Sequence, residues 1–285
     1  MFKVIVNATS ANVCVGFDVL GIALALANEF TFDESKDFEF YGFDDIYCTK
    51  ENNMVYDSYV KTFEYAHKCV IPVKISFSGE IPVCRGLGSS SSLIVAGVFA
   101  ANHMMKDILS YEECLNICTE IEGHPDNVAP AIYGGLVASF KSSKGYMSIN
   151  YPVSKELKFI TIIPPFKLST HEARSVLPND LPIPDIVSNL SRIVNVPLAL
   201  KDGNVELLKE LFVDKIHEPY RGRLIPGYDL IKDVCSKENA AFAISGSGST
   251  MLVIAKDCSI VKKLEKFNYQ IKVLNIGSGV VIEEK

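Results

Sequence analysis

The chain reads Arg-Gly-Leu-Gly-Ser-Ser-Ser-Ser from Arg85 to Ser92, at the start of an apolar stretch that predicts a helix from about Ser90 to Lys106. Glycines let the backbone bend so that successive N–H groups point inward, and a helix N-terminus adds positive potential. The serines add hydroxyl groups, one of which could ligate Mg²⁺. The run therefore predicts a phosphate-binding loop, although not a Walker A loop, because no Gly-Lys-Ser/Thr follows the glycines. Read alone, it leaves open a plain serine N-cap after a glycine turn.

Composition limits the function classes. The 285 residues are 48% hydrophobic and 22% charged, with a formal net charge of −6. This is a globular composition, and it lacks the dense basic surface that nucleic-acid binding demands. The longest apolar runs, Val19 to Ala27 and Ile94 to Ala101, are far shorter than the roughly 20 residues that span a bilayer. With no clear signal-peptide cleavage site, we expect a cytoplasmic protein without a membrane or nucleic-acid partner.

Eight cysteines are scattered along the chain, with no C-x-x-C pair and no histidine spacing typical of zinc. The nearest two, Cys114 and Cys118, share one face of a predicted helix. We expect core cysteines in a reducing compartment, with a redox or metal role as the alternative.

The hydrophobic pattern predicts an α+β protein whose two mixed layers divide near residue 152. The pattern predicts strands at Phe2 to Ala8, Val73 to Ser78, Leu136 to Phe140, Met147 to Tyr151, Leu157 to Ile163 and Ile271 to Ile276, and two apolar strands on either side of Ser245 to Ser249. Besides the helix after the glycines, periodicity predicts helices at Ser110 to Gly123, Ile186 to Leu200, Val205 to Phe212, Tyr228 to Lys237 and Ser259 to Phe267. The polar, proline-rich segment Ser169 to Pro184 is expected to be a long functional loop.

Two further segments concentrate polar groups. Ala8 to Asn12, followed by Gly16-Phe17-Asp18, places Asn12 and Asp18 between a strand and an apolar stretch, where simple turn chemistry is the alternative. The segment Glu-Ile-Glu-Gly-His-Pro-Asp-Asn, Glu120 to Asn127, has more polar groups than capping explains. A carboxylate there could hold Mg²⁺ together with a loop serine, since phosphoryl transfer needs a bridging cation.

Arginine is used sparingly, five times against 23 lysines. Arg174 and Arg221 each stand in a polar segment, and bidentate recognition of a carboxylate is a physical reason to prefer arginine. A solvated surface arginine is the alternative for each. A second glycine-serine turn, within Ala243 to Thr250, is explained either by a hairpin or by close approach of the backbone to a ligand.

In this order the motifs resemble the superfamily of galactokinase, homoserine kinase, mevalonate kinase and phosphomevalonate kinase (GHMP kinases), whose phosphate loop reads like Gly86 to Ser90. Four segments look specifically like those of homoserine kinases: Ser10 to Asp18, Glu122 to Asn127, Ser169 to Arg174 and Ile216 to Arg221. The resemblance covers nearly the whole chain. It implies an S5-like N-terminal nucleotide-binding domain, residues 1–152, a ferredoxin-like C-terminal domain, residues 153–285, and phosphorylation of homoserine by ATP with Mg²⁺ in threonine biosynthesis.

The resemblance also implies roles for residues. Those expected at the amino-acid site are Asn12, Asp18, His124, Asn127, Arg174 and Arg221, with the arginines on the substrate carboxylate and Asp18 on its ammonium. Those expected at the nucleotide are Asn53, Arg85, Gly86, Leu87, Gly88, Ser89, Ser90, Ser91, Gly246 and Gly248. Glu120, favoured over Glu122, is expected to hold magnesium together with Ser90.

We expect Asn127, Glu120 and Arg174 to be the catalytic residues. Asn127 stands where other superfamily members commonly have a catalytic aspartate, and an amide cannot accept a proton. Catalysis by alignment and charge neutralisation is therefore expected. Cys14 replaces the usual glycine or serine in the first motif. Another alcohol acceptor, such as threonine or a mevalonate-like compound, and a non-catalytic ATP-binding protein remain open alternatives, and the family implies a homodimer.

Overall fold

The computed structural model describes residues 1–284 and is built around two β-sheets. The first has seven strands in the order β11-β1-β2-β4-β3, with the β5-β6 hairpin attached through β2; the second has four, in the order β10-β7-β9-β8. The strands are β1 (Phe2–Ala11), β2 (Leu20–Glu34), β3 (Glu39–Tyr41), β4 (Val73–Gly79), β5 (Leu136–Ser142), β6 (Gly145–Tyr151), β7 (Lys158–Ile163), β8 (Ala241–Ile244), β9 (Met251–Ala255), β10 (Gln270–Leu274) and β11 (Val281–Glu284). All pairings are antiparallel except that of β3 with β4.

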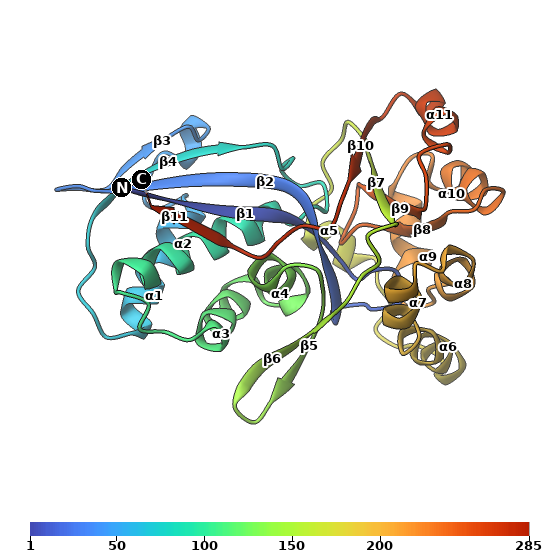
Figure 1. Ribbon diagram of the computed structural model, residues 1–285, viewed down its shortest axis with the longest axis horizontal. Coiled ribbons are helices and arrows are strands. Elements are labelled where there is room, and N and C mark those ends of the chain that lie inside the picture. Colours follow the sequence, from blue (N-terminus) through green and yellow to red (C-terminus); the bar gives the residue numbers. More distant parts are fainter. Residues whose placement is uncertain (285) are drawn as a thin grey trace.

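The helices belong mainly to two groups. Helices α1 to α4 lie on one face of the first sheet, and α6 to α11 accompany the second sheet, with α5 at the junction (Figure 1). They are α1 (Met54–Tyr65), α2 (Ser89–Met104), α3 (Tyr111–Glu122), α4 (Pro125–Tyr133), α5 (Thr170–Ser175), α6 (Ile183–Ile193), α7 (Val196–Asp202), α8 (Val205–Leu211), α9 (Glu218–Arg221), α10 (Tyr228–Ser236) and α11 (Val261–Leu264), with short 3₁₀ turns at Asp45–Tyr47, Gly222–Leu224 and Glu265–Phe267.

Helix α2 is the centre of the N-terminal core. It is apolar around most of its circumference, and eleven of its residues are buried between the first sheet and helices α1, α3 and α4. A helix that is hydrophobic on all sides must be enclosed by neighbouring elements. Its N-terminus, directly after the glycine run, is therefore held in a fixed place.

The α+β class and the two mixed layers are confirmed, but several elements differ from the prediction. From Leu20 onward, the apolar run Val19 to Ala27 belongs to the 15-residue strand β2, which pairs with β1, β4 and β5 and is mostly buried. Helices α1 and α4 were not predicted. The helix expected over Ile186 to Leu200 is two helices, α6 and α7, and the loop expected over Ser169 to Pro184 contains α5.

The last strand departs from a simple division near residue 152. Strand β11 pairs with β1, from Phe2 opposite Glu284 to Ile5 opposite Val281, and thus returns to the first sheet. Figure 1 shows the two ends of the chain side by side. The N-terminal half is therefore completed by the C-terminal residues, and the boundary between the two halves is crossed twice.

The cysteine prediction holds for half of the set. Cys14, Cys114, Cys118 and Cys235 are buried, and burial raises the pKa of Cys114 and of Cys235 to about 12. Cys69, Cys84 and Cys258 are exposed instead. Within residues 1–284, no helix is both long enough and apolar enough to cross a membrane.

Candidate active site

A cavity of about 610 Å³ is lined by residues from both halves of the chain. Its walls come from the loop after β1, the segment before α1, the glycine run, the start of α4, α5, α9 and the turn between β8 and β9. This size is typical of small-molecule sites. The cavity combines three chemically different groups of residues.

The first group is the glycine run. Gly86 and Gly88 have φ values of +74° and +67°, in the left-handed region that favours glycine. A Cβ on Gly88 would lie 2.0 Å from Thr9 Oγ1, and one on Gly86 would lie 2.2 Å from the Ser245 carbonyl oxygen. The loop therefore packs against β1 on one side and the second glycine-serine turn on the other. Its backbone leads directly into the N-terminus of α2, where unpaired N–H groups favour an anion.

Glu122, at the end of α3, is directly connected to this loop. Its Oε1 accepts hydrogen bonds from the Ser90 and Ser91 hydroxyls, at 2.9 and 2.7 Å. Carboxylate and hydroxyl oxygens are ligands that Mg²⁺ accepts, and this ion usually uses one or two carboxylates together with substrate phosphates. The donor set of Glu122 and Ser90 therefore fits a magnesium–triphosphate site. The described residues contain no cluster of three His, Cys, Asp or Glu side chains that would hold a metal on its own.

The second group is a set of charged side chains. Arg174 on α5 forms a bidentate pair with Asp18, from Nη1 to Oδ2 at 3.0 Å and from Nη2 to Oδ1 at 2.8 Å. Both side chains remain about one third exposed to the cavity. Arg221 lies close by, and the guanidinium carbons of both arginines are within 5.6 Å of the centre of the Phe17 ring. Burial and the charge of Arg174 lower the pKa of Arg221 to about 10, so it is still cationic at neutral pH.

Beside these charges, the first turn of α4 contributes a second pair. His124 Nδ1 and Asp126 Oδ1 are 2.5 Å apart, and Asp126 is buried. Burial alone would lower the pKa of His124, but the hydrogen bond and charge of Asp126 outweigh it and raise that pKa. The Asn127 amide oxygen accepts a hydrogen bond from Thr9 Oγ1 at 2.8 Å, which fixes the orientation of the amide.

The third group is apolar and aromatic. It includes stacked Phe43 and Phe77, whose ring centres are 5.1 Å apart. The further apolar members are Tyr47, Met54, Ile81, Pro82, Val83 and Leu93. Asn53 lies among them, but its side chain caps α1, accepting from the Val55 and Tyr56 N–H groups and donating to the Tyr47 carbonyl. Flat apolar surfaces of this kind suit an aromatic base.

Comparison with known proteins agrees with this geometry. The GHMP kinase N-terminal domain model matches residues 53–135, and the GHMP kinase C-terminal model matches residues 198–268. The homoserine kinase of Clostridium beijerinckii is 43% identical over 96% of this chain and 93% of its own length; that of Clostridium acetobutylicum is 37% identical over 99% and 100%. The chain belongs to the homoserine kinase family of GHMP kinases. The crystal structure of homoserine kinase from Cytophaga hutchinsonii superposes with a TM-score of 0.87, at 27% identity, over 99% of this chain and 96% of that one.

In this member of the homoserine kinase family, most residues singled out from the sequence line the one cavity. They are Asn12, Asp18, Asn53, Arg85, Gly86, Gly88, Ser89, Ser90, His124, Asn127, Arg174, Arg221 and Gly246. Leu87, Ser91 and Gly248 do not line it. Leu87 is fully buried, Ser91 is bonded to Glu122, and Gly248 packs against Ile225 and Leu168. These three residues therefore contribute to the packing around the loop and not to the cavity wall.

The structure does not bring Glu120, the expected magnesium ligand, to the cavity. Glu120 is exposed on α3 and does not line the cavity, whereas Glu122 lines it and contacts the loop serines. Residues two apart on a helix point to different sides. Glu122 continues the buried row of Cys114 and Cys118 at four-residue spacing, and this periodicity was the signal in the sequence that distinguishes the two glutamates.

Three cavity features were not predicted from the sequence. The aromatic pair Phe43 and Phe77 comes from segments without a recognisable motif. Asp126 was noted only as part of a polar segment, and its contact with His124 depends on the start of α4, which was not predicted. The pairing of Asp18 with Arg174 joins residues 156 positions apart.

A buried carboxylate holds the helix that carries Arg221. Glu218 Oε1 accepts from the Ile244 N–H at 2.6 Å and Oε2 accepts from the Tyr228 hydroxyl at 3.0 Å. Burial raises the pKa of Glu218 from its ordinary 4.5 to about 7. Below pH 4.5 the group is protonated in both states and has no effect on stability. Between pH 4.5 and 7 it ionises only in the unfolded chain, so it costs stability as the pH rises.

Glu218→Gln is expected to remove this pH dependence, because an uncharged glutamine can accept from the Ile244 N–H through its oxygen and donate its amide N–H to the Tyr228 hydroxyl oxygen. Its free energy of unfolding, relative to the unsubstituted protein, should increase by about 3 kcal/mol between pH 4.5 and 7.5. Urea unfolding followed by circular dichroism at several pH values measures this difference. A difference that is constant over that range would contradict the assignment.

Proposed function

We propose that the chain transfers the γ-phosphoryl group of ATP to the side-chain hydroxyl of L-homoserine, giving O-phospho-L-homoserine for threonine biosynthesis. The observation that carries this proposal is the Asp18–Arg174 pair, with Arg221 beside it, in the same cavity as the glycine-serine loop. An amino acid has an ammonium and a carboxylate on one carbon. Asp18 is suited to the first group, and the two arginines to the second.

Binding in this account exchanges one set of ion pairs for another. Without an acceptor, Asp18 and Arg174 neutralise each other. A zwitterionic acceptor replaces each partner with one of its own charges, so no charge is left unpaired in the cavity. An alcohol that lacks one of the two charges would leave either Asp18 or the arginines without a partner. This unpaired charge would disfavour binding of such an alcohol relative to a zwitterionic acceptor.

The charge of the cavity supports a divalent cation as part of the nucleotide complex. The lining includes five carboxylates, Asp18, Asp44, Glu80, Glu122 and Asp126, against the three arginines Arg85, Arg174 and Arg221, and no lysine among the described residues. Arg85 is in addition bonded to the carbonyl groups of Val83, Cys84 and Pro164. We infer that Glu122 and Ser90 hold Mg²⁺, which would neutralise charge on the triphosphate.

The residues of the chain then act by alignment. The glycine loop and the α2 N-terminus hold the phosphates, the aromatic group accommodates the base, and the charged group fixes the acceptor so that its hydroxyl faces the γ-phosphorus. Asn127, held by Thr9, is placed to donate a hydrogen bond but cannot accept a proton. The hydroxyl proton is lost late, to the transferred phosphoryl group itself, as a loose transition state permits.

Asn127→Ala tests this passive role. We expect kcat to fall by about tenfold, because one oriented donor is lost while the charges and the metal ligand remain. Steady-state kinetics with saturating ATP and homoserine measure the change. If kcat falls as far as it does on loss of the proposed metal ligand Glu122, the amide has a direct role in the chemistry and the passive account is wrong.

A coupled assay of ADP release, with Mg²⁺ present and homoserine, threonine and mevalonate compared side by side, tests the function. Homoserine should stimulate ADP release most strongly. Preference for mevalonate would favour another acceptor class, and no stimulation by any of the three would favour a non-catalytic ATP-binding protein. A cytoplasmic location and a homodimer stay predictions.

A further inference from the structure

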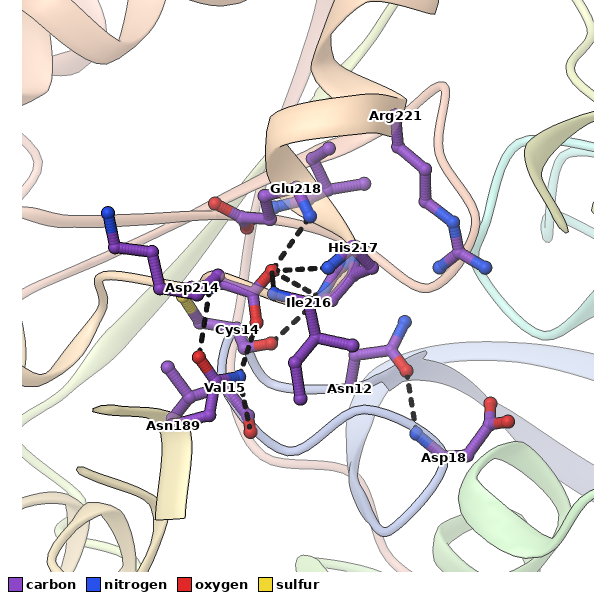
Figure 2. A network of polar contacts seen from close by, with 12 residues as sticks. Asn12, Cys14, Val15, Asp18, Asn189, Asp214, Ile216, His217, Glu218 and Arg221 are labelled. Carbon is purple, nitrogen blue, oxygen red and sulfur yellow. Dashed lines mark hydrogen bonds and ion pairs between the residues drawn. The ribbon is translucent and has the colours of Figure 1, made fainter. Parts of the chain in front are cut away.

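A buried polar network lies between the loop after β1 and the segment that leads into α9 (Figure 2). At its centre is the buried carboxylate of Asp214. Its Oδ2 accepts from the backbone N–H groups of Ile216, His217 and Glu218, at 3.1, 2.7 and 2.8 Å. Its Oδ1 accepts from Asn189 Nδ2 at 2.6 Å. One carboxylate therefore fixes the backbone where α9 begins.

The network reaches the loop through two side chains. His217 Nε2 donates to the Cys14 carbonyl oxygen at 2.8 Å, and Asn189 Nδ2 lies 3.4 Å from the Val15 carbonyl oxygen. Because a carbonyl can only accept, the hydrogen of His217 is on Nε2. Burial lowers the pKa of His217, which keeps the ring neutral. His217 and Asn189 are both buried.

The loop that they hold is strained. Asn12, Val13, Cys14 and Asp18 have φ values of 71°, 37°, 62° and 56°, in a region that residues other than glycine seldom adopt. Such a conformation persists only where the surroundings determine it. The bonds to the Cys14 and Val15 carbonyls supply that constraint at the centre of the loop, and the Asn12 amide, which accepts from the Asp18 N–H at 3.1 Å, supplies it at the ends.

The same network determines where Arg221 lies. Arg221 is three residues after Glu218 on α9, and its Nη1 donates to the Gly246 carbonyl, which also accepts from Asn12 Nδ2. On the loop side, the Phe17 ring stacks on the His217 ring with centres 5.3 Å apart and faces the Arg221 guanidinium. The distance between Asp18 and Arg221 is thus set in part by His217 and Phe17, which do not line the cavity.

We propose that His217, with Asp214 and Asn189, is a positioning element that holds Asp18 and Arg221 at the separation required by the ammonium and carboxylate of the acceptor. This inference rests on the proposed function and deepens it. His217 is buried and does not line the cavity proposed to hold the acceptor and the nucleotide. Its loss should therefore weaken acceptor binding selectively, because a small misplacement of charged groups is costly in an aligned site.

Two variants at one position separate positioning from packing. Glutamine can place its amide N–H near the position of His217 Nε2 and keep the bond to Cys14, whereas leucine of similar size cannot. We expect His217→Leu to raise KM for homoserine by about tenfold or more and to leave KM for ATP unchanged. In His217→Gln, both KM values should stay within about threefold of those of the unsubstituted protein. Both variants lose the aromatic stack, so their difference reports the hydrogen bond.

Thr161→Val is a matched control. Thr161 is buried in β7 and donates to the Lys272 carbonyl at 3.3 Å, away from the cavity, so losing this bond should change neither KM. Equal KM values for the two His217 variants would overturn the inference. So would a parallel rise of KM for ATP in His217→Leu, which would indicate general destabilisation.

Hydrogen exchange tests the positioning without a substrate. Peptides that cover residues 12–19 should exchange about tenfold faster in His217→Leu than in His217→Gln, because the strained loop loses its central constraint. Equal exchange rates would contradict the inference even if the enzyme is active on homoserine. If the unsubstituted protein does not phosphorylate homoserine while the exchange rates differ as expected, the proposed function fails and the structural coupling stands.

Discussion

Glu122→Gln is expected to lower kcat by about 1,000-fold, which corresponds to about 4 kcal/mol of transition-state stabilisation. Glutamine keeps an oxygen that can accept from the Ser90 and Ser91 hydroxyls, so the loop should retain its shape while the negative charge that binds Mg²⁺ is lost. The Mg²⁺ concentration that gives half-maximal activity should rise in parallel.

Glu120→Gln is the control for this prediction. The two substitutions are chemically identical and lie two residues apart on α3, but Glu120 is exposed and outside the cavity. Its kcat and its Mg²⁺ dependence should stay within about twofold of the unsubstituted protein, as is usual for surface positions. A large loss in Glu120→Gln and none in Glu122→Gln would show that the metal ligand is assigned to the wrong glutamate.

Arg174→Met is expected to raise KM for homoserine by about 100-fold and leave KM for ATP nearly unchanged. Methionine keeps much of the side-chain volume but removes the bidentate donor and leaves Asp18 without its partner. Truncating one member of a charged, hydrogen-bonded pair costs about 2–5 kcal/mol, and partial exposure of this pair places it near the lower end.

Two further variants test whether the rise in KM for homoserine comes from losing the bidentate guanidinium of Arg174. Arg174→Lys keeps the positive charge but not the planar guanidinium, so its KM for homoserine should lie between that of Arg174→Met and that of the unsubstituted protein. Arg223→Met changes an exposed arginine two residues from Arg221 that does not line the cavity, and it should behave like the unsubstituted protein. If Arg174→Met and Arg223→Met have the same KM for homoserine, Arg174 does not bind the acceptor.

The phosphate loop could be predicted from the sequence because all its determinants are local. Gly86, Gly88 and the following serines lie within one short segment, and the helix behind them is uniformly apolar. The same holds for the capped start of α3 at Ser110. Strand β2 could not be distinguished in this way, because a buried strand with neighbours on both sides has a continuous apolar run instead of an alternating pattern.

The acceptor end depends on contacts between distant segments. Nothing local to Asp18 indicates that Arg174 is its partner, and only the resemblance to a known family placed the two in one site. The residues that position Asp18 and Arg221 were even harder to predict from the sequence. Asp214 and Asn189 lie outside the segments singled out from the sequence, and His217, within Ile216 to Arg221, was given no role there. His217 and Asn189 contact backbone carbonyls of a loop 203 and 174 residues away, and Asp214 holds the backbone N–H groups at the start of α9. That Glu120 is exposed and that Glu122 faces the loop could, in contrast, be predicted from helix periodicity.

The most direct test of the central claim is ³¹P nuclear magnetic resonance of the reaction of the purified protein with ATP, Mg²⁺ and L-homoserine. The account predicts that the γ-phosphate signal of ATP is replaced by that of a phosphomonoester coupled to the side-chain methylene protons of homoserine, in an amount equal to the ADP formed. Inorganic phosphate with unchanged homoserine, or no loss of ATP, would contradict it.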